Sequence, residues 1–422
     1  MTTLRFSKNL TLVIFLIICI SELSLVALLT DLPISISNWQ GKSRELLDFS
    51  FPTSNFYGPG GAILILPFLW SGPSFMIPVF FYFTLGCIGF FLLSRNIENK
   101  FIRLISLLLI PANPYLVWLC YSSQDTVFEF ALLTWAMYFL QRKNWIPYTL
   151  VAYLLAQTRA GYWTPFLGLA VIILVRDLIM KHKLNWRKFL AFPLVIITLS
   201  SNWFIYASPS PALEGGMTAY FSYSKYQYLA LPKMDMDVFL SGDRGIFSEG
   251  YGPKVPLNAS EADENRIFQE AAIDSALANP KETLLALMQK FENYFIGVQK
   301  VPHLPGSYVL NQDSKSIEIG DERLRWSLIL GNLTYELYRT ALLLFGLLSL
   351  GGLMFAGRFG AAISFRQLKL GILAAPWLFG AVPALLFYTE TRFKVVSETL
   401  LFLLILEMWS VLLRARKPEI LK

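Results

Sequence analysis

A set of ionisable residues stands at the ends of apolar stretches of this sequence. They are Asp31, Asp48, Asp125, Arg159, Glu390, Arg392 and Lys394. A carboxylate in such a position can act as a general base toward an acceptor hydroxyl. An arginine or lysine can hold a phosphate through charge-assisted hydrogen bonds. The alternative interpretation is that these charges only face water where the apolar stretches end.

Other catalytic groups are scarce. The only histidines are His182 and His303, so the sequence has neither an H-E-x-x-H zinc motif nor a histidine-rich relay. Cys19, Cys87 and Cys120 lie in apolar stretches and form no C-x-x-C pair, which indicates neither a disulfide framework nor a thiolate metal site. Catalysis must therefore rest on carboxylates, arginine, lysine and hydroxyl groups.

The composition indicates what kind of chain positions these residues. Of the 422 residues, 55% are hydrophobic and 15% are charged, and the mean hydropathy is +0.50. An ordinary soluble domain has about 25% charged residues, and a disordered chain lacks the apolar side chains found here. The composition excludes both classes and predicts an integral membrane protein.

We expect an all-α polytopic protein with about ten transmembrane helices, because one crossing needs roughly 20 apolar residues. The clearest apolar stretches are residues 10–30, 74–94, 101–120, 126–140, 189–207, 340–357, 370–388 and 395–413. Residues 145–175 have basic residues at both flanks. Basic residues collect in the cytoplasm, so this stretch is expected to cross twice, with Arg159 at the outer turn. Both termini are then cytoplasmic, and the net charge of +7 marks orientation and implies no nucleic-acid partner.

The outer face is expected to carry two large segments. The first is a loop over residues 31–60, followed by a short interfacial helix or half-helix over 61–70. The second is a loop domain over 208–325, which we expect to be mainly helical or irregular. It separates a transmembrane module of about seven spans at 1–207 from one of about three spans at 326–422.

Two helices are predicted within this loop domain. Ser260 can cap a helix over 261–278, and Asn279-Pro280 ends that helix and begins another, since proline is tolerated in a first turn. An apolar stripe with helical spacing follows in the second helix, formed by Leu284, Met288, Phe291 and Phe295. We expect this stripe to pack on the membrane domain or to lie at its surface.

These features resemble the GT-C superfamily of integral-membrane glycosyltransferases. The resemblance is strongest to the bacterial branch related to protein O-mannosyltransferases and aminoarabinose transferases. An acid, Asp31, follows the first span, and an aromatic-Gly-Pro run, Phe56-Tyr57-Gly58-Pro59, closes the first outer loop. The fourth span has a polar, acidic start from Ser122 to Glu129.

Three further segments carry the resemblance in the rest of the chain. Arg159 precedes an aromatic residue and a proline, Tyr162 and Pro165. Residues 261–280 are similar to the A-x-x-x-I-x-x-N-P segment of the family's soluble part. Glu390-Thr-Arg-Phe393 is similar to its E-x-R-F/Y motif before the final span.

The resemblance implies transfer of a sugar from a polyprenyl-phosphate donor to a glycan, lipid or protein acceptor, by direct displacement with inversion. Asp31 or Asp48 would take the acceptor proton; the choice stays open because Leu32-Pro33 stands where the family usually has a second acid. Arg392, with Lys394 or Arg159, would bind the donor phosphate. The pocket would be lined by Asn55, Tyr57, Asp125 and Glu390. The active site would lie on the extracytoplasmic face of a bacterial inner membrane.

Two other classes of protein stay open. An O-antigen-type polymerase or ligase would depend on arginine-rich outer loops, whereas here carboxylates and arginines are mixed. A non-enzymatic transporter or flippase of lipid-linked glycans would place charges inside its spans, whose centres are nearly free of charge here. A lipid-phosphate donor requires no cofactor, although Asp235-Met-Asp237 is a pattern that can bind a divalent metal through its oxygens.

Overall fold

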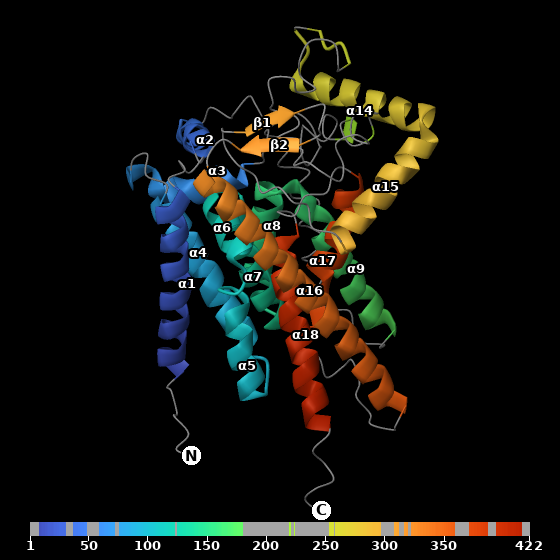
Figure 1. Ribbon diagram of the computed structural model, residues 1–422. Coiled ribbons are helices and arrows are strands. Elements are labelled where there is room, and N and C mark those ends of the chain that lie inside the picture. Colours follow the sequence, from blue (N-terminus) through green and yellow to red (C-terminus); the bar gives the residue numbers. More distant parts are fainter. Residues whose placement is uncertain are drawn as a thin grey trace, which may run out of the picture.

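The computed structural model describes residues 8–30, 37–48, 59–71, 76–122, 125–179, 219–220, 223, 253–256, 258–296, 308–311, 316–319, 322–358, 371–386 and 394–415. These residues are mainly helical, with one short pair of strands. Figure 1 shows a bundle of long helices with shorter elements gathered at one end, which we call the outer end.

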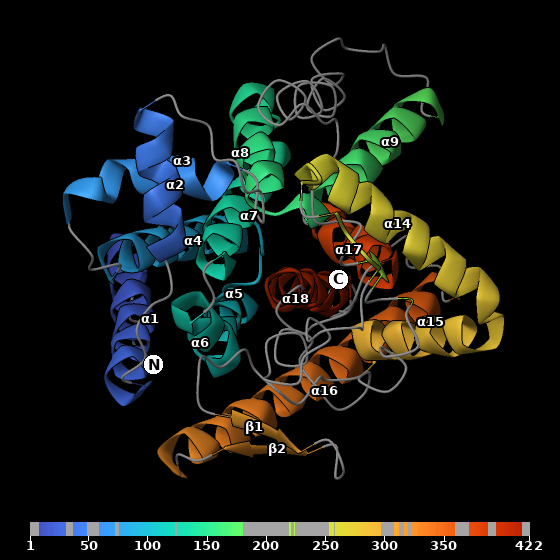
Figure 2. The ribbon, with the colours of Figure 1, turned by 90° about the horizontal axis from the view of Figure 1, so that it is seen from above.

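The bundle is built from segments of both halves of the chain. Its helices are α1 (Lys8–Thr30), α4 (Met76–Ser94), α5 (Lys100–Ser106), α6 (Pro114–Ser122), α7 (Thr126–Gln141), α8 (Trp145–Thr158), α9 (Trp163–Ile179), α16 (Glu322–Arg358), α17 (Ala374–Leu386) and α18 (Val395–Ala415). Seen from above in Figure 2, α18 lies in the middle. The first residue of α1 and the last of α18 lie at the end opposite the outer end (Figure 1).

Several of these helices have the length and composition of membrane spans. Within the described part of the chain four qualify: Asn9–Leu28, Met76–Ser94, Leu333–Gly352 and Val395–Arg414. A bent pair, Lys100–Leu109 with Pro114–Ser122, makes a fifth if it is one span. The chain therefore has the helices of a membrane protein, in agreement with the composition.

The ten predicted crossings stay a prediction. Helices α7, α8 and α17 have 16, 14 and 13 residues. At 1.5 Å per residue they are about 20–24 Å long, less than the roughly 30 Å of a bilayer core. The span predicted at 189–207 lies outside the described residues.

The span predicted over 101–120 is broken into two helices. After α5 a short 3-10 helix, η2, covers Leu107–Leu109, and α6 begins at Pro114 with a bend of 44°. Pro111 and Pro114 have no N–H for a continuous helix. The Asn113 side chain instead accepts the Leu116 N–H at 3.1 Å and caps α6.

The stretch 145–175 forms two helices, as predicted. Helix α8 ends at Thr158 and α9 begins at Trp163, with the 3-10 helix η3 (Ala160–Tyr162) between them. Arg159 is thus at the turn, and Figure 1 places this turn at the outer end.

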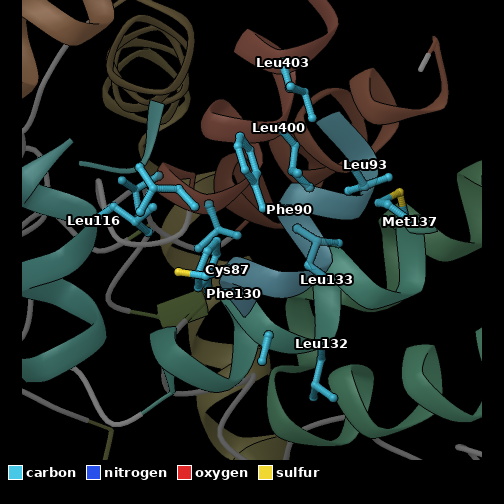
Figure 3. Close-up of a cluster of buried hydrophobic side chains, with 14 of the residues drawn as sticks. Cys87, Phe90, Leu93, Leu116, Phe130, Leu132, Leu133, Met137, Leu400 and Leu403 are labelled. Atoms are coloured by element: carbon cyan, nitrogen blue, oxygen red, sulfur yellow. The ribbon is translucent and has the colours of Figure 1, made fainter. Parts of the chain in front are cut away.

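The bundle core joins the N-terminal helices to α18. Gly89 of α4 allows close approach of α7, since a Cβ atom there would lie 2.7 Å from Thr134 Oγ1. Figure 3 shows Leu400 and Leu403 of α18 in one cluster with Phe90 of α4 and Leu133 of α7. The two predicted transmembrane modules therefore share one hydrophobic core.

The outer end holds most of the remaining described elements (Figure 1). They are α2 (Ser37–Leu47), α3 (Gly60–Ile65) with the 3-10 helix η1 (Leu66–Ser71), α14 (Glu261–Ala278), α15 (Pro280–Phe295), β1 (Tyr308–Asn311) and β2 (Ser316–Ile319). The predicted short helix after the first outer loop is therefore present.

The loop domain confirms its two predicted helices and adds a β-ribbon. Ser260 Oγ accepts the Asp263 N–H at 3.2 Å and caps α14, and α15 begins at Pro280. Strands β1 and β2 pair antiparallel, with Tyr308 opposite Ile319. Four residues per strand are too few for a period of two to show in the sequence, which is why the ribbon was not predicted.

Candidate functional site

A first cluster of buried ionisable side chains lies where α7 begins and α8 ends. Asp125 precedes α7 and Glu129 lies in its first turn, where the helix dipole favours negative charge. Arg159 follows the last residue of α8, and Tyr162 ends η3. All four residues are buried.

Arg159 joins the two carboxylates of this cluster. Its Nε donates to Asp125 Oδ2 at 2.6 Å, and its Nη1 donates to Glu129 Oε2. The Tyr162 hydroxyl donates to the other oxygen of Glu129. With both carboxylates ionised, the four side chains carry one net negative charge. We call Asp125, Glu129, Arg159 and Tyr162 the acidic network.

The acidic network adjoins the end of the first outer loop. Gly60, the first residue of α3, packs so closely on the last turn of α8 that a Cβ atom would lie 2.5 Å from Thr158 N. A hydrogen bond joins α2 to α3, because Ser43 Oγ donates to Ala62 O at 2.7 Å. The contact to α8 therefore holds α2 and α3 beside the residue that precedes Arg159.

A second buried cluster lies between α16 and the beginning of α18. Arg339 Nε is 3.0 Å from Glu398 Oε1, and the Tyr335 hydroxyl donates to Glu398 Oε2. Lys394, directly before α18, is buried beside them. When Lys394 is protonated, Tyr335, Arg339, Lys394 and Glu398 together carry one net positive charge. We call these four residues the basic network.

Two cations of the basic network bind the end of α15. Arg339 Nη2 donates to Tyr294 O at 2.9 Å. Lys394 Nζ donates to Tyr294 O at 3.2 Å and also to Asn293 O. Cations are favoured at the carboxyl end of a helix, where carbonyl groups lack helical partners. Burial lowers the pKa of Lys394 to about 7, with Glu398 opposing this shift and Arg339 adding to it.

Helix α17 lies between the two networks. The Tyr294 hydroxyl donates to Trp377 O at 2.7 Å. On the other side, Thr164 Oγ1 donates to Phe379 O at 3.0 Å. Pro383 has no N–H for that carbonyl, so Thr164 supplies the hydrogen bond that the proline removes. Helix α17 thereby connects α15 with the beginning of α9.

Tyr162 of the acidic network interacts electrostatically with Tyr294 of α15. Burial raises the pKa of the Tyr162 phenol; Arg159 opposes this rise, and Tyr294 and Asp125 add to it. Tyr294 in turn belongs to the helix end that the basic network binds.

The structure brings some predicted site residues together and separates others. Asp125 and Arg159 are bonded to each other, and Lys394 belongs to the basic network. Asp48 follows α2 as an exposed residue, and its N–H donates to Arg44 O at 3.0 Å. Outside the described residues lie Asp31, Asn55, Tyr57, Glu390, Arg392, Asp235 and Asp237.

Arg159, predicted to bind the donor phosphate, contacts two carboxylates in the structure. Its guanidinium faces two carboxylates, so its charge is already compensated within the protein. This favours a role in positioning Asp125 and Glu129 over direct binding of a phosphate.

The sequence reading overlooked Arg339 and Glu398. Both lie in helices whose apolar segments can cross a membrane, where an ionisable residue costs several kcal/mol and needs a partner. The sequence contains this signal, because the ionisable residue Glu398 lies inside the predicted span 395–413. It did not stand out, because the centres of the predicted spans are otherwise nearly free of charge.

In the described part of the chain, no three His, Cys, Asp or Glu side chains are grouped as metal ligands. Comparison with protein-family models, curated proteins and solved structures finds no match to this chain. Its function must therefore be argued from the chemistry of the site and from the resemblance in the sequence.

Proposed function

We propose that this chain is an integral-membrane glycosyltransferase of the GT-C kind. It transfers a sugar from a polyprenyl-phosphate donor to a glycan, lipid or protein acceptor on the extracytoplasmic face. In this proposal the chain crosses a bacterial inner membrane ten times and has both termini in the cytoplasm. One observation carries the proposal: the apolar bundle holds two buried networks of charged side chains, the acidic network and the basic network.

Opposite charges suit the displacement of a phosphate from a sugar. A carboxylate is needed to take the acceptor proton, and cations are needed where negative charge grows on the leaving phosphate. Buried charges at a membrane boundary are expensive. Their presence in two sets of opposite net charge favours a site for a charged ligand over an inert helix end.

The proposed reaction is a single displacement. Asp31 or Asp48 takes the proton of the acceptor hydroxyl, and the acceptor oxygen attacks the anomeric carbon opposite the phosphate. The bond between that carbon and the phosphate oxygen breaks, and the lipid phosphate leaves with the electron pair. One displacement at this carbon inverts its configuration.

The remaining residues have supporting roles in this scheme. Arg392, two residues before Lys394 in the sequence, holds the donor phosphate. Lys394 already donates to two carbonyl groups of α15, so it fixes this helix and adds positive charge nearby. Arg159 positions the carboxylates of Asp125 and Glu129. The sugar pocket is completed by Asn55, Tyr57 and Glu390.

The proposal is tested by sugar transfer in proteoliposomes that contain the purified chain. A panel of radiolabelled polyprenyl-phosphate sugars is offered with cell-envelope acceptors, and the products are analysed for anomeric configuration. We expect transfer from one donor type, with inversion. Asp31→Asn or Asp48→Asn should lower the rate by about 100-fold or more, since general-base catalysis contributes at least this factor.

Glu45→Gln is the matched control, because Glu45 is an exposed carboxylate on the helix that precedes Asp48. Arg392→Gln should weaken the use of the donor. The proposal fails if the folded chain transfers no sugar from any donor in the panel. It also fails if both aspartate variants keep the full rate.

The same assay distinguishes the two alternative functions. A polymerase or ligase would move a preassembled glycan and would not use a single lipid-linked sugar. A flippase would translocate the lipid-linked sugar without breaking its phosphate bond, and Asp→Asn changes in the first outer loop would not abolish translocation.

A further inference from the structure

Helix α15 presents a face of exposed apolar side chains. Its inner face, with Lys290 and Tyr294, is buried against α17. On the opposite face, Leu284, Met288 and Phe291 are 59%, 61% and 52% exposed. We call these three residues the outer stripe of α15. Phe295, the fourth residue of the predicted apolar stripe, instead packs against Trp377 of α17. The stripe thus packs on the bundle at its end and is exposed along the rest of its length.

The end of α15 lies beside the apolar part of α16. Arg339, whose Nη2 donates to Tyr294 O at 2.9 Å, is six residues inside the apolar segment Leu333–Gly352. Six residues correspond to about 9 Å along a helix. The last turn of α15 is therefore level with a section of α16 that is suited to hydrocarbon.

The outer stripe continues an apolar surface that has no covering protein among the described residues. Leu333 and Leu337 of α16 are exposed close to Arg339, and Ile296 is exposed directly after α15. Figure 1 shows α15 descending from α14 onto α16 and α17. The charged residues Lys281 and Glu282 are exposed at the opposite, upper end of the helix. Helix α15 therefore carries exposed charged side chains at its beginning and lies beside exposed apolar side chains at its end.

We propose that the outer stripe of α15 lies in the outer leaflet of the bilayer and contacts lipid acyl chains. A helix with one apolar face and a charged beginning binds at the boundary of headgroups and acyl chains. Phe291 lies one turn before Tyr294, whose carbonyl oxygen Arg339 of α16 binds, and Leu337 is exposed two residues before Arg339. Lipid contact thereby anchors α14 and α15 on the leaflet, independently of the reaction that the chain catalyses.

Spin labelling tests this contact in phospholipid bilayers. Single cysteines replace Met288, Phe291, Lys281 or Leu337 in a chain whose three native cysteines are changed to alanine. Each site is labelled with a nitroxide, and its collisions with oxygen, which concentrates in lipid, are compared with those of a water-soluble nickel chelate. The chain with its native cysteines, all of them buried, is the unlabelled reference.

We expect oxygen contact to dominate at 288 and 291, as at the lipid-facing control site 337, and nickel contact to dominate at 281. A larger oxygen preference at 291 than at 288 would fit the descent of α15 into the leaflet. Dominant nickel contact at 288 and 291 would overturn the proposal in favour of water. Low contact with both reagents would also overturn it, and spin–spin broadening would then identify a second copy as the covering surface.

Discussion

Replacing Arg159 with methionine tests whether the acidic network is a buried charge cluster. Methionine keeps an unbranched apolar stem, but it leaves Asp125 and Glu129 without their cation. Tyr162 still donates one hydrogen bond to Glu129. Two carboxylates in one buried site cannot both stay ionised without a large cost. We therefore expect the folded variant to bind one proton that the unfolded chain does not bind at pH 7.

The expected loss of stability follows from that proton. Protonating a carboxyl group with an ordinary pKa near 4 costs about 4 kcal/mol at pH 7 and about 1.4 kcal/mol at pH 5, at about 1.36 kcal/mol per pH unit. The first value agrees with the roughly 3–5 kcal/mol lost when one partner of a buried ion pair is removed. Because the folded variant holds the additional proton, its stability must rise as the pH falls.

The free energy of unfolding can be measured by titration with sodium dodecyl sulfate in mixed micelles at pH 7 and pH 5. The matched control is Arg266→Met on α14. Arg266 also faces two carboxylates, Asp263 at 3.6 Å and Glu270 at 3.3 Å, but all three side chains are exposed. Exposed pairs contribute less than about 1 kcal/mol, so this control should lose little stability and show little dependence on pH.

A second variant, Arg159→Met with Glu129→Gln, removes one of the two unpaired charges. It should regain part of the loss at pH 7 and depend less on pH than the single variant. Equal losses for Arg159→Met and Arg266→Met would refute the reasoning. A loss for Arg159→Met that stays unchanged between pH 7 and pH 5 would refute it as well.

Two further substitutions test residues that pack beside the site, and the same detergent titration measures the free energy of unfolding. Gly60→Ala should destabilise the chain by about 1–3 kcal/mol, because its Cβ would meet Thr158 N at 2.5 Å; Gly41→Ala, with nothing within 4 Å, should not. Lys290 is buried with its pKa lowered to about 7, so the unfolded chain binds more protons above pH 7 and stability should rise by up to about 2.7 kcal/mol from pH 7 to 9. Lys290→Met should remove this contribution and leave that of Lys394, whose pKa is also lowered to about 7; a parent chain without any rise would contradict the burial of a titrating lysine.

Local signals account for the parts of the fold that the sequence predicted. Helices α1, α4 and α18 begin and end within two residues of the predicted stretches 10–30, 74–94 and 395–413, because a run of apolar residues is itself what hydrocarbon selects. Ser260 and Pro280 mark the beginnings of α14 and α15, since capping depends on neighbouring residues.

Predictions failed where the local sequence signal was weak or was given less weight than the apolar pattern. Pro111 and Pro114 interrupt the stretch 101–120. Because that stretch was predicted as one span from its apolar residues alone, the break between α5 and α6 was not predicted. The ribbon of β1 and β2 is too short to show alternation. Of the candidate site, Asp125 and Arg159 were named and are paired in the structure, but Arg339 and Glu398 were not named.

The sequence by itself therefore determined that the chain has the composition of a membrane protein, where several of its helices begin and end, and which charges stand at their ends. Only the tertiary structure decided which of these charges meet. Arg159 pairs with residues 34 and 30 positions earlier, and Arg339 pairs with Glu398. It also decided that the outer stripe of α15 points outward. Packing and lipid both select apolar side chains, so the amino-acid pattern cannot tell a face that is covered by protein from one that is covered by a bilayer.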